Sequence, residues 1–166
     1  MPEQKVIERA REDEREGKSP STQAGEFVRE EFHHIREGKH GARSPQQAIA
    51  IGLSKARRAG VKLQPPRGGR FSRRLKRQAE RDYERGRRGN LTRVSPTRSR
   101  ITSAVLKREG RAAGSTHAIS SQTRRAAQRR SPSSRSAAAV KAVRTRGRAE
   151  LSAAGRKAAR TRKSRS

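Results

Sequence analysis

The chain of 166 residues has a length that suits one domain, but only 28% of its residues are hydrophobic and 2% aromatic, against 36% charged. This composition excludes a large apolar core, because it buries too little surface to offset chain entropy. The net charge of +29 implies a polyanionic partner, nucleic acid first and an acidic membrane surface second, and the absence of cysteine excludes disulfides and thiolate metal sites.

The charge is divided unevenly along the chain. Residues 1–40 carry 8 basic and 10 acidic side chains, and residues 41–64 carry 5 basic side chains and no acidic one. The basic excess follows, with 13 against 3 over residues 65–100 and 18 against 2 over residues 101–166. The chain thus has a near-neutral head (residues 1–64) and a cationic body. This asymmetry is typical of proteins whose basic tail binds nucleic acid or a membrane surface.

Residues 1–18 predict a charged N-terminal helix that ends at Gly17, with an apolar stripe made only by Val6, Ile7 and Ala10. The segment lacks the apolar run of a signal peptide. No later stretch approaches the roughly 18 apolar residues of a membrane span. We therefore expect a cytoplasmic protein.

Residues 22–63 predict a helical hairpin module. Apolar side chains recur over residues 22–37 at the spacing of one helix face. Ser44 can cap a second helix over residues 45–59, because a proline suited to the first helical position follows it. Gly60 is suited to a left-handed turn at the end of that helix.

The second helix also carries a family resemblance. Residues 43–60 read RSPQQAIAIGLSKARRAG, and the helix before them contains Phe27 and Phe32 and ends in the turn Glu37-Gly38-Lys39. This arrangement resembles the S-x-x-Q-A-I-A-I-x-L-S-x-A-R-x-A-G helix of small basic bacterial proteins, which form an uncharacterised family with a domain of unknown function. The resemblance covers about residues 22–63 and implies a bacterial origin and a two-helix fold, with no activity and no catalytic residues.

The basic body begins with a Pro/Gly linker over residues 64–70 and a basic amphipathic helix over residues 71–85. Residues 86–166 then form an Arg-, Ala- and Ser-rich basic tail. Within this tail, the segment 136–146 recurs as residues 152–162. The repeat is similar in composition to the tails of linker histones and of bacterial histone-like proteins.

We expect the tail to be disordered or transiently helical, with weak helices over about residues 101–109 and 119–130. Alanine favours helix, whereas repulsion between like charges opposes it. Binding a polyanion would remove that repulsion and drive coil to helix. The expected fold class is all-α: a small αα-hairpin with a largely disordered or transiently helical Arg-rich remainder.

Phosphate contacts are expected mainly from this basic body. Arginine makes up 34 of the 44 basic residues, and its planar fork can grip a phosphate with two hydrogen bonds. Such contacts position a protein on nucleic acid without reading its sequence. The candidate nucleic-acid-binding residues are Arg57, Arg58, Arg73, Arg74, Arg77, Arg124, Arg125, Arg129, Arg130, Lys141, Arg144, Arg146, Lys157, Arg160, Arg162 and Lys163.

The hairpin has two interpretations. It could be a helix-turn-helix whose second helix holds phosphates with its arginines and with Lys55 and Lys62. We prefer a structural or dimerising unit, because the first helix carries acidic residues that DNA would repel: Glu26, Glu30, Glu31 and Glu37. We expect this acidic face to neutralise the protein's own tail or to meet another subunit.

No metal site, cofactor or catalytic centre is expected. His33 and His34 are adjacent and point in different directions on a helix, while His40 lies in a glycine turn and His117 is isolated. Glu30 and His34 are four residues apart and offer at most a weak metal site. The sequence contains no nucleophile elbow and no phosphate-binding loop, so we expect a non-enzymatic protein.

The sequence thus predicts a sequence-tolerant nucleic-acid-binding protein, histone-like and nucleoid-associated, with DNA preferred to RNA. One alternative is an RNA-binding or ribosome-associated basic protein. Another is an adaptor that binds a protein partner, or self-associates, through the helical hairpin. No small-molecule substrate is expected, and membrane binding is disfavoured because the chain lacks the large apolar residues of amphipathic anchors.

Overall fold

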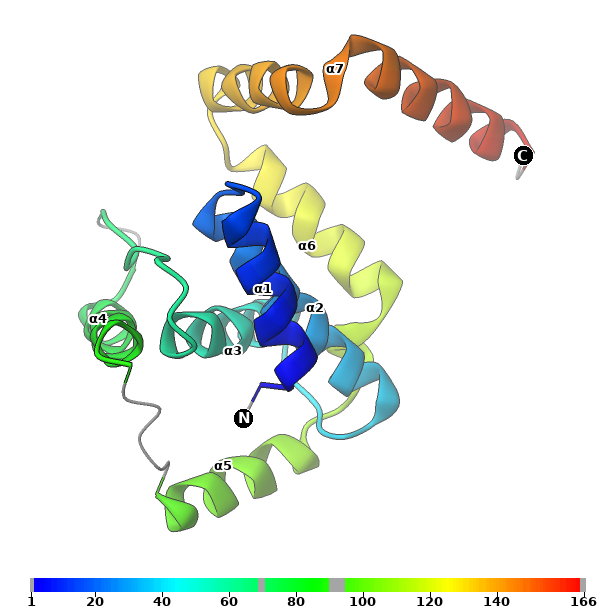
Figure 1. Ribbon diagram of the computed structural model, residues 1–166. Coiled ribbons are helices and arrows are strands. Elements are labelled where there is room, and N and C mark those ends of the chain that lie inside the picture. Colours follow the sequence, from blue (N-terminus) through cyan, green and yellow to red (C-terminus); the bar gives the residue numbers. More distant parts are fainter. Residues whose placement is uncertain (1, 69–70, 90–94, 165–166) are drawn as a thin grey trace. The chain divides into compact units, whose positions relative to one another are not determined.

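The computed structural model describes residues 2–68, 71–89 and 95–164, and all its regular elements are helices (Figure 1). The chain forms two compact units, residues 1–122 and 123–166. The all-α class is confirmed over the described residues. The expected disordered remainder is not supported, because four α-helices lie beyond the hairpin.

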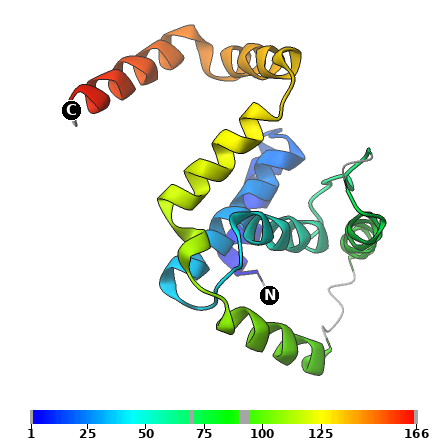
Figure 2. The same ribbon diagram turned by 180° about the vertical axis from the view of Figure 1, so that it is seen from behind.

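The core of the first unit is built on α2 (Pro20–Glu37), which packs against both α1 (Gln4–Arg15) and α3 (Pro45–Arg58) (Figures 1 and 2). The predicted hairpin is therefore present as α2 and α3. Its turn begins at Gly38, whose φ of 77° places it in the left-handed region that favours glycine.

Serine–proline pairs begin four of the helices. In each of them the serine is the N-cap and the proline takes the first helical position, where a missing N–H costs no hydrogen bond. In α3 the Ser44 hydroxyl accepts a hydrogen bond from the Gln47 N–H at 3.2 Å. The Gln47 side chain in turn accepts from the Arg43 N–H at 2.9 Å, which is a capping box shifted by one residue.

Two small apolar clusters hold α2 in place. The first joins α1, α2 and the end of α3 and contains Val6, Ala10, Ala24, Phe27, Ala56 and Val61. The second lies toward the end of α2 and contains Phe32, Ile35, Ala42, Ala48 and Ala113. As the composition predicts, the core is small and mostly aliphatic.

The predicted left-handed turn after α3 is present. Gly60 has a φ of 98°, and the Val61 N–H returns to the Ala56 carbonyl at 3.1 Å. Val61 is buried in the first cluster, as expected for the apolar contact that accompanies such a turn.

Helix α4 (Arg73–Arg87) docks on α3, a contact that the sequence did not predict. Ala79 and Asp82 are its buried residues, and the Ser54 hydroxyl donates to Asp82 Oδ2 at 2.6 Å. Gly86 lies so close to α3 that a Cβ there would be 1.9 Å from the Arg57 carbonyl oxygen. Only glycine fits this position without a shift of the backbone.

The elements after α4 contact α2, α3 and the loop between them. Helix α5 (Pro96–Arg108) is followed by the 3₁₀ helix η1 (Ala112–Gly114). The loop before α3 is bonded to this region, since the Gly41 N–H donates to the Leu106 carbonyl at 2.9 Å. Residues 96–100, expected to be disordered, belong to α5 instead.

Helix α6 (Thr116–Gln128) crosses from the first unit into the second, where α7 (Pro132–Lys163) follows. A kink divides α7 at Gly147, which has a φ of 75° and a ψ of 157°, a conformation nearly restricted to glycine. The two repeat copies, residues 136–146 and 152–162, lie on opposite sides of this kink.

Candidate functional site

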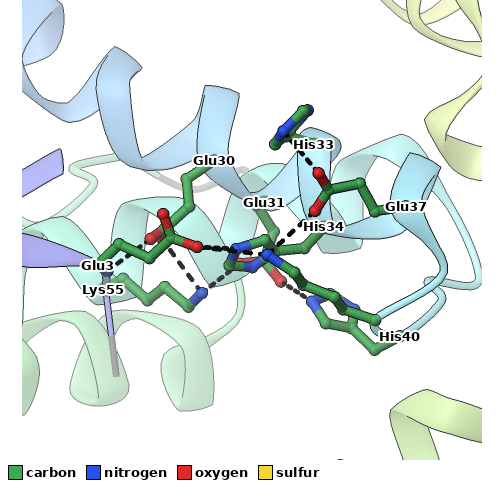
Figure 3. A network of polar contacts seen from close by, with 9 residues as sticks. Glu3, Glu30, Glu31, His33, His34, Glu37, His40 and Lys55 are labelled. Carbon is green, nitrogen blue, oxygen red and sulfur yellow. Dashed lines mark hydrogen bonds and ion pairs between the residues drawn. The ribbon is translucent and has the colours of Figure 1, made fainter. Parts of the chain in front are cut away.

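A buried charged cluster lies at the packing surface of α2 with α3 (Figure 3). Glu30 and Glu31 are 5% and 1% exposed, so they face the core and neither the tail nor another subunit. The expectation that these two acids form a surface face is therefore wrong. Glu31 follows Phe27 by four residues and precedes Ile35 by four, so the helix places it within the apolar stripe.

The Lys55 ammonium reaches this cluster from α3. Its Nζ lies 2.7 Å from Glu31 Oε2 and 3.5 Å from Glu30 Oε2, and 14% of its side chain is exposed. Lys55 is thus an internal counter-ion for the two carboxylates and not an exposed phosphate ligand. Glu30 also accepts the Glu3 backbone N–H at 2.7 Å, which bonds the start of α1 to α2.

Two histidines complete the cluster. The His34 Nε2 lies 3.0 Å from Glu3 Oε1, and the His40 Nε2 lies 3.0 Å from Glu31 Oε1. The rings meet edge to face, with centroids 6.0 Å apart. Hydrogen bonds to Glu3, from His34 first and then from Lys39, lower the pKa of that carboxyl group.

The same residues form two overlapping sets of metal-ligating atoms. Glu31, His34 and His40 bring one ligand atom each to within 4.8 Å of one another, and so do Glu3, Glu30 and His34. Sequence reasoning identified only the Glu30–His34 spacing. It placed His40 apart in a turn, although the turn that Gly38 begins returns His40 to α2 (Figure 3). The sequence signal that could have indicated this cluster was Glu31, an acidic residue within the apolar stripe of α2.

His33 does point away from this cluster, as expected from its position beside His34 (Figure 3). Its side chain is 66% exposed and its Nε2 lies 2.9 Å from Glu37 Oε1. A hydrogen bond from Lys39 lowers the pKa of Glu37.

The two candidate phosphate ligands of α3 have internal partners. Arg57 is 8% exposed and donates to the carbonyls of Leu63 and Gln64 at 3.1 Å and 3.4 Å. Burial lowers the pKa of Arg57. Arg58 donates to the Ser54 carbonyl at 3.3 Å and is 34% exposed. Arg57 therefore ties the chain after α3 to that helix, and it does not present its guanidinium to solvent.

The remaining candidates are distributed over α4, α6, α7 and the segment between α6 and α7. Their side chains are exposed wherever the structure describes them. The side chain of Arg146 is not among the described ones. The exposed candidates are Arg73, Arg74, Arg77, Arg124, Arg125, Arg129, Arg130, Lys141, Arg144, Lys157, Arg160, Arg162 and Lys163.

The two units differ in how their charges are matched. In the first unit several basic side chains pair with acids from other elements, as in Arg9 with Glu26 at 3.1 Å and Lys62 with Glu14 at 2.9 Å. The hydrogen bond from Lys62 to Glu14 raises the pKa of the lysine. In residues 123–166 a single acidic residue, Glu150, accompanies 15 lysines and arginines.

Comparison with known proteins finds a match for only part of the chain. Residues 17–67, which include α2 and α3, match a family described as "Family of unknown function (DUF6496)". This match agrees with the expected resemblance of residues 22–63 to an uncharacterised family. Neither the curated proteins nor the solved structures contain a match to the chain. Among the described helices, none combines the length and the apolar character that crossing a membrane requires.

Proposed function

We propose that the protein binds nucleic acid through the cationic helices of its second unit, without reading base sequence. One observation carries the proposal: residues 123–166 combine 15 basic side chains with one acidic side chain, and their described residues are all partly or fully exposed. Because none of the described side chains of these helices is buried, their charge faces solvent and calls for an external polyanion. Each phosphate contact releases condensed counterions, which favours binding at low salt.

DNA is the first candidate, in a histone-like, nucleoid-compacting role, and RNA is the second. The major groove of B-form DNA is wide enough to admit an α-helix, whereas the major groove of A-form RNA is deep and narrow. Both α6 and α7 are helices, so duplex DNA suits their form better. An adaptor function of the head has less support, because Glu30 and Glu31 have internal partners.

A matched pair of triple variants tests the proposal in the full-length protein. The tail variant changes Lys157, Arg160 and Arg162 to glutamine, and the head variant makes the same change at Lys5, Arg11 and Arg15. Both sets contain one lysine and two arginines and are exposed. Affinity for a random-sequence DNA duplex and for an RNA duplex is measured across a range of salt concentrations.

If the three tail residues engage phosphates, the slope of log affinity against log salt falls in magnitude by about 2.7 for DNA, and the head variant leaves it unchanged. Equal losses in both variants would mean that only the net charge matters and would contradict a tail-specific interface. Tighter binding to RNA at matched salt would favour the alternative ligand.

A further inference from the structure

Within the described part of the chain, the buried carboxylate of Glu31 lacks the hydrogen bonds that its two oxygens could accept. The side chain is 1% exposed, and neither oxygen has a hydrogen-bond partner among the described residues. Its contacts with Lys55 at 2.7 Å and His40 at 3.0 Å are ion pairs by distance, without the directions of hydrogen bonds. Such a buried carboxylate is costly unless a further cation compensates it.

The charges around Glu31 leave room for that cation. Two buried carboxylates, Glu30 and Glu31, share one partly buried ammonium, that of Lys55. Lys55 lies against Oε2 of Glu31, so Oε1 is the oxygen that faces His40. If the histidines are neutral, two carboxylates face one ammonium, and the uncompensated negative charge lies at Glu31 Oε1.

The orientation of His40 supplies the nitrogen donor. Its Nδ1 lies 3.0 Å from the Gly41 carbonyl oxygen, which can only accept, so Nδ1 carries a hydrogen. A neutral ring then directs the lone pair of Nε2 at Glu31 Oε1, and two acceptors 3.0 Å apart need a cation between them. Metal-binding histidines are held in this way, with the second nitrogen donating to a carbonyl or carboxylate.

His34 is held in the same manner, because its Nε2 donates to the Glu3 carboxylate at 3.0 Å. One ring nitrogen of His34, one of His40 and one oxygen of Glu31 lie within 4.8 Å of one another. Ligands about 2.1 Å from a tetrahedral zinc ion lie about 3.4 Å apart, so small side-chain movements would bring this set onto one ion.

We propose that Glu31, His34 and His40 bind a divalent transition-metal ion of the zinc type. Two imidazoles with one carboxylate favour such an ion over magnesium or calcium, which prefer all-oxygen ligands. The inference is independent of the proposed nucleic-acid function. An excess proton on the cluster is the competing way to compensate the charge.

The chain is well suited to a test, because it contains no cysteine and only four histidines. Untagged full-length protein, first stripped of metal, is titrated with Zn²⁺ in the absence of nucleic acid, and its thermal unfolding is recorded. Mg²⁺ and Ca²⁺ serve as control ions. The variants are Glu31→Gln and His40→Gln, and the matched control is His33→Gln, which replaces the exposed neighbouring histidine.

Zn²⁺ is expected to raise the unfolding temperature of the wild type and of His33→Gln, whereas Mg²⁺ and Ca²⁺ leave it unchanged. Glu31→Gln and His40→Gln should weaken the apparent affinity at least about tenfold. No response of the wild type to Zn²⁺, or an equal response in His40→Gln, overturns the site and leaves the proton as the compensating charge.

A second measurement covers variants that fail to fold. In wild-type protein, nitrogen-15 spectra of the imidazole rings are recorded with and without one equivalent of Zn²⁺. The ring signals of His34 and His40 should change, and those of His33 and His117 should not. Changes confined to His33 and His117 would contradict the assignment.

Discussion

Gly52 of α3 lies against Val28 of α2 so closely that a Cβ on the glycine would be 2.7 Å from the Val28 Cα. In an open helix position alanine is more stable than glycine by about 1 kcal/mol. At Gly52 we expect the opposite sign: Gly52→Ala should lower the free energy of unfolding by roughly 1 to 3 kcal/mol, because α2 and α3 must separate.

The matched control for Gly52 is Gly25→Ala in α2, where a Cβ would meet nothing within 4 Å. This variant should raise the free energy of unfolding, in line with helix propensity. Urea unfolding of both variants gives the comparison. A rise in the free energy of unfolding in both variants would mean that the close contact of α3 with α2 is not formed.

The buried charges predict a large effect at Lys55. Lys55→Met keeps the apolar stem and leaves Glu30 and Glu31 without their shared cation, so the free energy of unfolding should fall by about 3 to 5 kcal/mol. The double variant Lys55→Met/Glu31→Gln should regain part of this loss. If the double variant is as unstable as the single one, the pairing with Glu31 is not the source of the effect. Chemical denaturation at neutral pH measures both.

The docking of α4 depends on Asp82, which accepts hydrogen bonds from Ser54 at 2.6 Å and from Gln78 at 3.1 Å. Asp82→Ala leaves these groups unpaired and should cost about 1 to 3 kcal/mol. Amide hydrogen exchange should then increase in α4 before it increases in α2. The control is Glu80→Ala at an exposed position of α4, which should leave the exchange pattern unchanged.

The kink of α7 depends on the backbone of Gly147. Alanine is disfavoured at its φ of 75° and ψ of 157°, so Gly147→Ala should straighten α7 and increase its helix content. Spin labels at Ser134 and Ser164 should move apart, toward the about 45 Å of a continuous helix of 30 residues. Gly155→Ala, within the second half of α7, should leave this distance unchanged. An unaltered distance in Gly147→Ala would show that the kink has another cause.

Local signals in the sequence were sufficient to locate the hairpin and its ends. Ser44, Gly38 and Gly60 act through their own backbone geometry, so their effects are visible without knowledge of tertiary contacts. The same signal was available at Ser131, where a serine–proline pair begins α7, but the density of positive charge there favoured an interpretation as disorder.

The buried cluster and the docking of α4 could not be predicted in this way. Glu31, His40 and Lys55 come from α2, from the turn after it and from α3, and only the packing of these elements brings them together. The periodicity of α4 similarly indicates an amphipathic helix, but it does not indicate that α3 is its partner. Arg57 was assigned to phosphate by charge alone, whereas its role depends on burial.

The contact of α4 with α3 should keep these two helices associated even when the chain between them is cut. Ser54 binds Asp82, and Gly86 lies against the Arg57 carbonyl, while the loop between the two helices contains the exposed residue Arg67. A single cleavage of the backbone at Arg67 would therefore leave two fragments that elute as one species under native conditions. They would separate in denaturant, as two noncovalently associated chains do.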